Sequence, residues 1–366
     1  MRAWRRHRMK KISWEEYKRL SIAERIPYLA KADKENEPFH VLYAQQFDRT
    51  MLDDLCALAD QIRAVHKTPE GARFLQAQLS NKSALNLFAQ PSTRTFMSFE
   101  AAEQKLGMQV TDIRDVSTSS QAKGESLQNS IRTFSSYVDA IIMRHPDAGA
   151  AELAAYEMNM ADRRIPVLNG GSGRDQHPTQ ALLDIYTLQK SLDEIDGKKI
   201  AMVGDLMRGR TVRSLSYLMK NYKGVELYYV APERLRIGED IKDFLKRNHI
   251  RYTESESLEA VISIVDAVYM TRIQWEWDRA AGAEGAKDGE YDPRFVFKKE
   301  YLEKMKKKSC LLHPLPKINE IDPELDYVDD ARVVYWRQER NGMWIRAALL
   351  ARIFEVDQAI LGYDAS

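Results

Sequence analysis

Short apolar runs alternate with helix-like stretches along most of this 366-residue chain. The runs predict strands at 83–88, 139–143, 165–168, 199–203, 225–230, 266–270, 309–312 and 332–336. Strands of this kind that alternate with helices are typical of parallel sheets whose two faces are both covered. The sequence therefore predicts an α/β fold of two doubly wound parallel-sheet domains. Because such sheets bind ligands at the carboxyl ends of their strands, we expect the substrate site in the cleft between the domains.

Helical spacing marks several of the segments between the strands. Leu52, Leu55 and Ile62 recur at that spacing, and residues 50–53 resemble the capping box that opens a helix. Further helices are predicted from about residue 95 to 106 and from about 342 to 361.

Charge and cysteine content exclude several classes of protein. The chain has 55 Lys and Arg against 54 Asp and Glu, whereas proteins that bind nucleic acid usually carry a basic excess or stripe. No apolar run reaches the roughly 18 residues that a membrane helix needs. The two cysteines, Cys56 and Cys310, match no metal or redox spacing. We therefore expect no nucleic-acid partner, no membrane span, no metal site and a cytoplasmic location.

The first eleven residues, MRAWRRHRMKK, are strongly basic. Glu15 and Glu16 follow at once, and no apolar core of a signal peptide is present. We interpret this segment as a frayed tail before a short helix near residues 14–20. A targeting peptide and a start at Met9 are the alternatives.

Three hydroxyls and a guanidinium meet at a strand–turn–helix junction. Ser92, Thr93, Arg94 and Thr95 follow the strand that ends at Phe88. A helix N-terminus offers unpaired N–H groups and partial positive charge, so this segment suits a phosphate. The alternative is an ordinary N-cap with Arg94 in solvent. The chain contains no GxxxxGK[ST] and no GxGxxG, which argues against nucleotide hydrolysis and dinucleotide binding.

Other polar motifs also follow predicted strands. Arg144 is a candidate second anion ligand, and the segment 176–180 (QHPTQ) offers an imidazole and two amides for a carbonyl and an amino group. In the segment 313–316 (HPLP), two prolines remove N–H donors and leave carbonyls that can accept from an amine. Arg210 and Arg272 suit bidentate recognition of carboxylates. Each motif alone also fits a structural role: a surface arginine, a capped histidine or a rigid turn.

Taken in order, six motifs resemble the aspartate/ornithine carbamoyltransferase family. They are S-T-R-T, M-R-H-P, Q-H-P-T-Q, G-D-L-x-x-G-R-T, T-R-x-Q and H-P-L-P, and the resemblance runs from about residue 40 to 360. The aspartate branch is favoured, because the ornithine branch usually carries D-H-P-T-Q, H-C-L-P and an S-M-G motif. The implied function is carbamoyl transfer from carbamoyl phosphate to L-aspartate in pyrimidine biosynthesis, without a cofactor.

The resemblance also implies a role for each matching residue. Arg94, Thr95, Arg144 and His177 would be catalytic. Carbamoyl phosphate would be held by Ser92, Thr93, Arg94, Thr95, Arg144, His177, Gln180, Pro314 and Leu315. Aspartate would be held by Lys123, Arg210, Arg272 and Gln274. The segment 119–125 resembles the family's mobile loop, in which Ser119 and Lys123 reach the neighbouring subunit's site, so a homotrimer is implied, with pairing of trimers left open.

The implied domain division is an N-terminal extension at 1–40, a carbamoyl phosphate-binding domain at 41–178 completed by 342–366, and an aspartate-binding domain at 179–341. One departure from the family pattern lies inside the phosphate motif. The aspartate branch commonly reads S-T-R-T-R, whereas Phe96 stands here in place of the last arginine. Two alternatives stay open: a carbamoyltransferase that acts on another amino acid, and a catalytically silent homologue that serves as an assembly subunit.

Overall fold

The computed structural model describes residues 12–31, 34–114, 124–161, 163–173, 176–273 and 292–364. The chain divides into two compact units. Unit 1 comprises residues 1–179 and 342–366, and unit 2 comprises residues 180–341. Among the described helices, none is both long and apolar enough to cross a membrane.

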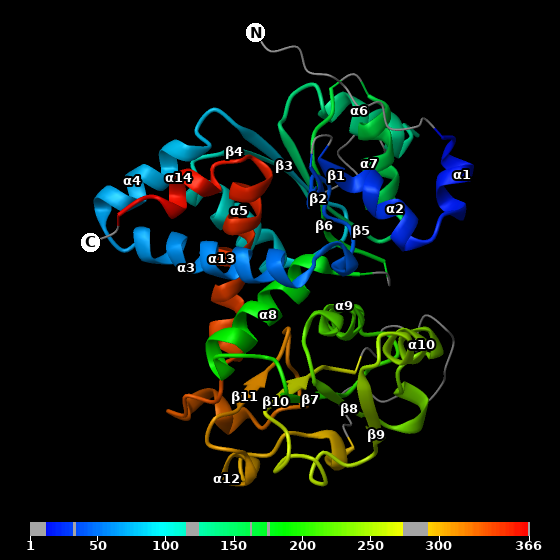
Figure 1. Cartoon of the computed structure of the whole chain (residues 1–366), viewed down its shortest axis with the longest axis vertical. Coiled ribbons are helices and arrows are strands. Elements are labelled where there is room, and N and C mark those ends of the chain that lie inside the picture. The colour runs from blue at the N-terminus through cyan, green and yellow to red at the C-terminus, as the bar shows by residue number, and fades with distance from the viewer. Residues whose placement is uncertain are drawn as a thin grey trace. The chain divides into compact units, whose positions relative to one another are not determined.

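Unit 1 is built on a four-stranded parallel sheet. Its strand order is β4 (Gln109–Ile113), β3 (Ser83–Phe88), β5 (Ala140–His145) and β6 (Val167–Ser172). Figure 1 shows α6 (Leu127–Phe134) and α7 (Ala150–Met160) on one side of this sheet, and α3 (Arg49–Val65) and α5 (Thr93–Lys105) on the other. Alternate strand residues such as Leu85, Leu87 and Ile141 pack under α6 and α7 in one apolar cluster. Helix α4 (Pro69–Gln78) follows α3.

The N-terminal segment of unit 1 forms two short helices and a hairpin. Helices α1 (Trp14–Arg19) and α2 (Ile22–Leu29) each begin with a complete capping box, at Ser13 and Ser21. The hairpin of β1 (Ala30–Lys31) and β2 (Lys34–Pro38) follows. The short helix expected near residues 14–20 is therefore confirmed.

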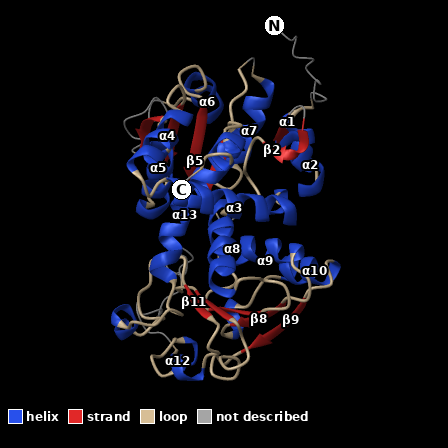
Figure 2. Cartoon of the chain, turned by 60° about the vertical axis from the view of Figure 1, so that its left-hand side comes forward, coloured by secondary structure: helices blue, strands red, loops and turns tan. Residues whose placement is uncertain are grey.

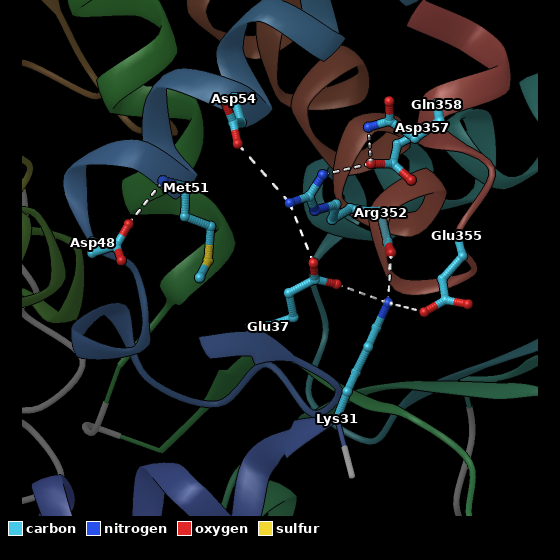
Figure 3. Close-up of polar contacts among 9 residues, drawn as sticks. All are labelled: Lys31, Glu37, Asp48, Met51, Asp54, Arg352, Glu355, Asp357 and Gln358. Carbon is cyan, nitrogen blue, oxygen red and sulfur yellow. Dashed lines mark hydrogen bonds and ion pairs between the residues drawn. The ribbon is translucent and has the colours of Figure 1, made fainter. Parts of the chain in front are cut away.

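A buried lysine joins this hairpin to the C-terminal helices α13 (Tyr335–Ile353) and α14 (Asp357–Leu361). Lys31 Nζ donates to the Arg352 carbonyl and to Glu355, both at 3.1 Å, and lies 3.3 Å from Glu37 (Figure 3). The Arg352 guanidinium in turn contacts Glu37 and Asp357. These ion pairs explain how both ends of the chain contribute to one unit.

Unit 2 contains a five-stranded parallel sheet. Its strand order is β11 (Cys310–Leu312), β10 (Ala267–Met270), β7 (Lys199–Val203), β8 (Glu226–Val230) and β9 (Arg251–Ser255). Helices α8 (Pro178–Leu192), α9 (Arg210–Leu218) and α10 (Glu239–Arg247) lie on one side, and α12 (Tyr301–Lys304) lies on the other (Figure 2). Short 3-10 helices of this unit occupy 219–221, 233–235, 293–295 and 323–327, and a further one lies at 44–46 in unit 1. The predicted parallel α/β fold class is confirmed.

Strand order places one topological switch point in each sheet. In unit 1 the chain leaves β3 for β4 on one side and returns to β5 on the other, so β3 and β5 are neighbours. In unit 2 the neighbours at the reversal are β7 and β10. Ligands of doubly wound folds bind at the carboxyl ends of strands at such points, because the diverging connections leave a crevice there.

Some predicted boundaries are wrong. Residues 332–336 are not a strand: Val333 makes only an isolated bridge with Leu311, and α13 begins at Tyr335. The single predicted C-terminal helix is instead α13 and α14. Helix α3 is capped by Asp48, which accepts from Met51 N, and not by Thr50. Strands β4 and β9 were not predicted, because as edge strands they carry mainly polar side chains.

Candidate active site

The phosphate motif lies at the carboxyl end of β3, where α5 begins. Ser92 is the N-cap residue of this helix, yet among the described residues its hydroxyl makes no capping hydrogen bond. The interpretation of Ser92 as an ordinary side-chain cap is therefore not supported. Thr93 and Arg94 are exposed at the helix start, whereas Thr95 is buried. The first turn of α5 thus presents N–H groups, hydroxyls and a guanidinium to one place.

Arg144 lies beside this turn because β5 is the neighbour of β3. Its Cα pairs in register with Phe88, the last residue of β3, and its carbonyl accepts from Gln90 N at 3.3 Å. The side chain is only 9% exposed, and its Nη1 donates to the Gly170 carbonyl at 3.0 Å. A guanidinium keeps its charge when it is buried, and the Gly170 carbonyl holds this one in place. Arg144 therefore puts a fixed positive charge beside the phosphate motif.

His177 reaches the same place from the segment that follows β6. Its Nε2 lies 3.3 Å from the Thr95 hydroxyl, and both side chains are buried. The strand before it runs past the predicted end at residue 168, since β6 continues through Gly170 and Gly171 to Ser172. Unit 1 therefore brings together the predicted residues Ser92, Thr93, Arg94, Thr95, Arg144 and His177.

Gln176, the first residue of the segment 176–180, has a structural position. Its Oε1 accepts from Ala44 N at 2.8 Å, and its Nε2 donates to Gln45 Oε1 at 2.8 Å. The side chain is 3% exposed. Both ends of the amide are thus used to hold residues 44–45, and the prediction that this amide binds a substrate is not supported.

The arginines of unit 2 lie at its own switch point. Arg210 is the first residue of α9, which follows β7, and Arg272 comes two residues after the end of β10, the neighbour of β7. Burial lowers the pKa of the Arg210 guanidinium, which still stays charged in proteins. Two guanidiniums at the ends of adjacent strands suit a ligand with two carboxylates.

The backbone segments that follow β7 and β10 are in close contact. Gly204 has φ +115°, and a Cβ there would lie 2.2 Å from the Thr271 carbonyl oxygen. Thr271 N and its hydroxyl both donate to the Val203 carbonyl. Only glycine fits at position 204, so the loops that carry Arg210 and Arg272 leave the sheet from a rigid junction.

The remaining predicted ligands of unit 2 are Gln180, Pro314 and Leu315. Gln180 lies in α8, and its Nε2 donates to Asp184 Oδ1 at 3.0 Å. Pro314 and Leu315 are half-buried in the turn after β11, where Leu315 adopts φ +51°. That left-handed conformation is costly for a leucine and persists only where its surroundings enforce it.

Three predicted residues lie outside the described residues: Ser119, Lys123 and Gln274. In the described part of the chain, no group of three or more His, Cys, Asp or Glu side chains is arranged to hold a metal ion. Sequence reasoning missed Asp184, which is fully buried against Gln180. Its only sequence signal was an acidic residue four positions after Gln180, a spacing that places both side chains on one face of a helix such as α8.

The chain matches two protein-family models over most of its length. Residues 40–190 match the aspartate/ornithine carbamoyltransferase carbamoyl-P binding domain, and residues 196–353 match the Asp/Orn binding domain of the same family. The chloroplastic aspartate carbamoyltransferase of Arabidopsis thaliana is 42% identical over 320 residues, which cover 87% of this chain and 78% of that protein. The aspartate carbamoyltransferase catalytic subunit of Methanocaldococcus jannaschii is 40% identical, over 83% of this chain and 94% of that protein.

Solved structures agree with the sequence matches. The catalytic subunit of M. jannaschii aspartate transcarbamoylase aligns with a TM-score of 0.73 at 37% identity, covering 87% of this chain and 99% of that one. The Trypanosoma cruzi aspartate transcarbamoylase in complex with carbamoyl phosphate and aspartate aligns with a TM-score of 0.74 at 32% identity, covering 89% and 97%. Together with the two family models, these similarities establish that this chain belongs to the aspartate/ornithine carbamoyltransferase family.

Proposed function

We propose that this chain is an aspartate carbamoyltransferase. It transfers the carbamoyl group of carbamoyl phosphate to the α-amine of L-aspartate, which gives N-carbamoyl-L-aspartate and phosphate for de novo pyrimidine synthesis. The observation that carries the proposal is that the two topological switch points carry different kinds of ligand-binding residue. The one in unit 1 presents anion and carbonyl ligands, whereas the one in unit 2 presents the two arginines that a dicarboxylate needs.

In this proposal unit 1 binds the phosphate and activates the carbonyl. Ser92, Thr93 and the Arg94 guanidinium hold the phosphate oxygens at the start of α5. Arg144 contacts phosphate and carbonyl oxygen together, and the Thr95–His177 pair donates to that oxygen. The relevant observation is the 3.3 Å contact between Thr95 and His177, which places two donor groups at one point.

Unit 2 supplies the ligands of the amine side. Arg210 and Arg272, with Gln274, take the two carboxylates of aspartate. Gln180 and the carbonyls of Pro314 and Leu315 accept from the carbamoyl NH₂. Two carboxylate-binding arginines favour aspartate over ornithine, whose side chain is cationic.

The reaction needs no covalent enzyme intermediate. The neutral α-amine attacks the carbamoyl carbon, and negative charge grows on the carbonyl oxygen. Fixed donors stabilise that charge better than water does, because they need not reorient during the reaction. The C–O bond to phosphate then breaks, and the departing phosphate accepts the amine proton. Holding both substrates in place removes the entropic cost of their encounter.

The proposed assembly is a homotrimer in which Ser119 and Lys123 act in the neighbouring subunit's site. The support is the resemblance of residues 119–125 to the family's mobile loop. The proposed compartment is the cytoplasm. The support is that both cysteines, Cys56 and Cys310, are buried and form no disulfide with each other, as is usual in a reducing compartment. The plant relatives are named chloroplastic, so cell fractionation with an antibody to this chain is the direct test.

The test of the activity is transfer of radiolabelled carbamoyl from carbamoyl phosphate to aspartate, ornithine and other amines. We expect labelled carbamoyl-aspartate with release of one phosphate for each carbamoyl group, and little product from ornithine. Product from another amine alone would identify a carbamoyltransferase of different specificity. Tight binding of carbamoyl phosphate without transfer to any amine would instead identify a silent assembly subunit.

A further inference from the structure

Three side chains of unit 2 donate hydrogen bonds to one buried carboxylate. Asp184 of α8 is 0% exposed and accepts three hydrogen bonds. Its Oδ1 accepts from Gln180 Nε2 at 3.0 Å and from Gln338 Nε2 at 2.7 Å, and its Oδ2 accepts from the Tyr269 hydroxyl at 2.9 Å. A carboxylate has no donor of its own, so it suits three converging donors.

This arrangement fixes the orientation of two carboxamides. The oxygen and nitrogen ends of a glutamine amide have almost the same shape, and only hydrogen-bond partners distinguish them. Because Asp184 takes the Nε2 ends, the Oε1 end of Gln180 is the one left for a further partner. The Oε1 end of Gln338 is used too, since it accepts from His313 N at 2.8 Å.

Through Gln338 the same carboxylate reaches the turn after β11. His313 is 1% exposed, and its Nδ1 accepts from Leu315 N at 2.7 Å. Its Nε2 therefore carries the proton and donates to Glu320 Oε1 at 2.7 Å. The other oxygen of Glu320 accepts from Ile318 N and Asn319 N. Every polar atom of the His313 ring is used, which holds the carbonyls of the turn in one orientation.

Two sets of acceptors are assigned to the carbamoyl NH₂: the Gln180 oxygen and the carbonyls of the turn after β11. Both depend on the Asp184 side chain for their orientation. We propose that Asp184 is a positioning residue that makes the site select an acyl phosphate bearing an NH₂ group over one bearing a methyl group. Asp184 binds the Gln180 NH₂ and so leaves the Gln180 oxygen for the ligand. Through Gln338 it also fixes the Pro314 and Leu315 carbonyls. The inference rests on the proposed function, because it needs Gln180 and the turn to face the carbamoyl nitrogen.

The charge state of Asp184 sets the conditions of the test. Burial raises the pKa of Asp184 to about 7, although the hydrogen bonds from Gln338, Tyr269 and Gln180 oppose the shift, and the nearby Glu339 adds to it. Above this pH the acceptor-only carboxylate predominates. Measurements at pH 8 therefore examine the form that fixes both amides.

The experiment compares carbamoyl phosphate with acetyl phosphate, which has a methyl group in place of the NH₂. In the full-length Asp184→Leu variant, both acceptor oxygens are lost, so the Gln180 and Gln338 NH₂ groups lose their common partner. We expect kcat/KM for carbamoyl phosphate to fall about 30- to 100-fold, because buried acceptors lose their orientation. The inhibition constant of acetyl phosphate, which competes whether or not it is turned over, should change less than about threefold, since it donates no N–H.

Two further variants make the result specific. Asp357→Asn removes another buried carboxylate, the partner of Arg352 in unit 1, and should leave both values unchanged. In a Gln180→Ala background, Asp184→Leu should cost much less than in the wild type, because two residues that act together are not additive. Equal losses for both acyl phosphates in a folded variant would overturn the proposal.

Thermal unfolding of each variant controls for stability. If Asp184→Leu does not fold, Gln338→Met keeps the carboxylate and removes only its link to His313. That variant should weaken carbamoyl phosphate use relative to acetyl phosphate binding, and an unchanged ratio would overturn the inference. If the wild-type protein transfers no carbamoyl group to aspartate, the proposed function fails, which is a different outcome from equal losses in the variants.

Discussion

The Thr95 hydroxyl and Nε2 of His177 lie 3.3 Å apart although 82 residues separate them along the chain. One begins the helix after β3, and the other precedes α8. Their meeting point lies within unit 1 at the carboxyl side of the sheet, where Arg144 also lies. Polar groups gathered in this way suit the role that we propose for them, since a developing oxyanion is stabilised by donors that are already in place.

Replacement of His177 tests that assignment. We expect His177→Ala to lower kcat about 100-fold with little change in the affinity for inorganic phosphate, because a donor to the carbonyl oxygen acts mainly in the transition state. His145→Ala is the matched control, since this half-buried ring accepts from Asp147 N and is assigned no substrate contact. Steady-state kinetics and phosphate competition would measure both. A loss confined to phosphate affinity would place His177 on the phosphate and not on the carbonyl.

Arg272 tests the carboxylate assignment in unit 2. We expect Arg272→Ala to raise the KM for aspartate about 10- to 100-fold, because a charge-assisted hydrogen bond is lost, while carbamoyl phosphate binding stays nearly intact. Arg247→Ala, on the last turn of α10, is a suitable control. Loss of carbamoyl phosphate binding with aspartate affinity retained would show that the role is assigned to the wrong substrate.

The shared site of the proposed trimer can be tested by mixing two inactive variants. Arg94→Ala and Lys123→Ala should each be nearly inactive as pure proteins. In trimers reassembled from equal amounts, about one site in four receives Arg94 from one subunit and Lys123 from the next, so about a quarter of wild-type activity should return. Verified mixed trimers without activity would exclude a role of Lys123 in trans.

Phe96 shows how this chain departs from the family pattern. The ring is 5% exposed, packs edge-on against Phe88 at 5.3 Å, and lies under the Arg114 guanidinium at 4.4 Å. We expect Phe96→Arg, which restores the common residue, to lower the free energy of unfolding by about 3 kcal/mol, because a charge replaces a buried ring beside another cation. Met97→Arg, at a position that is 58% exposed, should change it by less than about 0.5 kcal/mol. Urea denaturation measures both, and equal stability of the two variants would contradict the packing argument.

A buried carboxyl in unit 1 predicts a pH dependence of stability. Burial raises the pKa of Glu103 to about 8; the hydrogen bond from Asn86 opposes the shift, and Asp112 and Glu100 add to it. The folded state therefore holds this proton more tightly than the unfolded state does. Its contribution to stability is present at low pH and is lost as the pH rises from the ordinary carboxyl range to about 8.

Glu103→Gln should remove that loss, since an amide stays neutral. Relative to the wild type, we expect the variant to gain about 2–4 kcal/mol in the free energy of unfolding between pH 5 and pH 8. Glu70→Gln, at an exposed position of α4, is the control. Urea denaturation at both pH values gives the comparison, and parallel changes in wild type and variant would show that Glu103 ionises normally.

Much of this protein is determined by the sequence alone. The apolar runs at 83–88 and 199–203 coincide with β3 and β7, because a strand buried on both faces must be continuously apolar. The motif residues Ser92 to Thr95, Arg144, Arg210 and Arg272 were predicted to follow strands, and each lies at or just after a strand end. The positions of these residues could be predicted because each turn directly follows its strand along the chain.

Other features were decided only by tertiary structure. Strands β4 and β9 have polar sequences and exist because a neighbouring strand supplies their hydrogen bonds. Residues 332–336 are apolar enough for a strand, yet helix α13 begins within them, at Tyr335. The meeting of Asp184 with Tyr269 and Gln338 joins residues that are far apart in sequence. The spacing from Gln180 alone could not identify this carboxylate, because two of its three donors, Tyr269 and Gln338, are brought to it only by the fold.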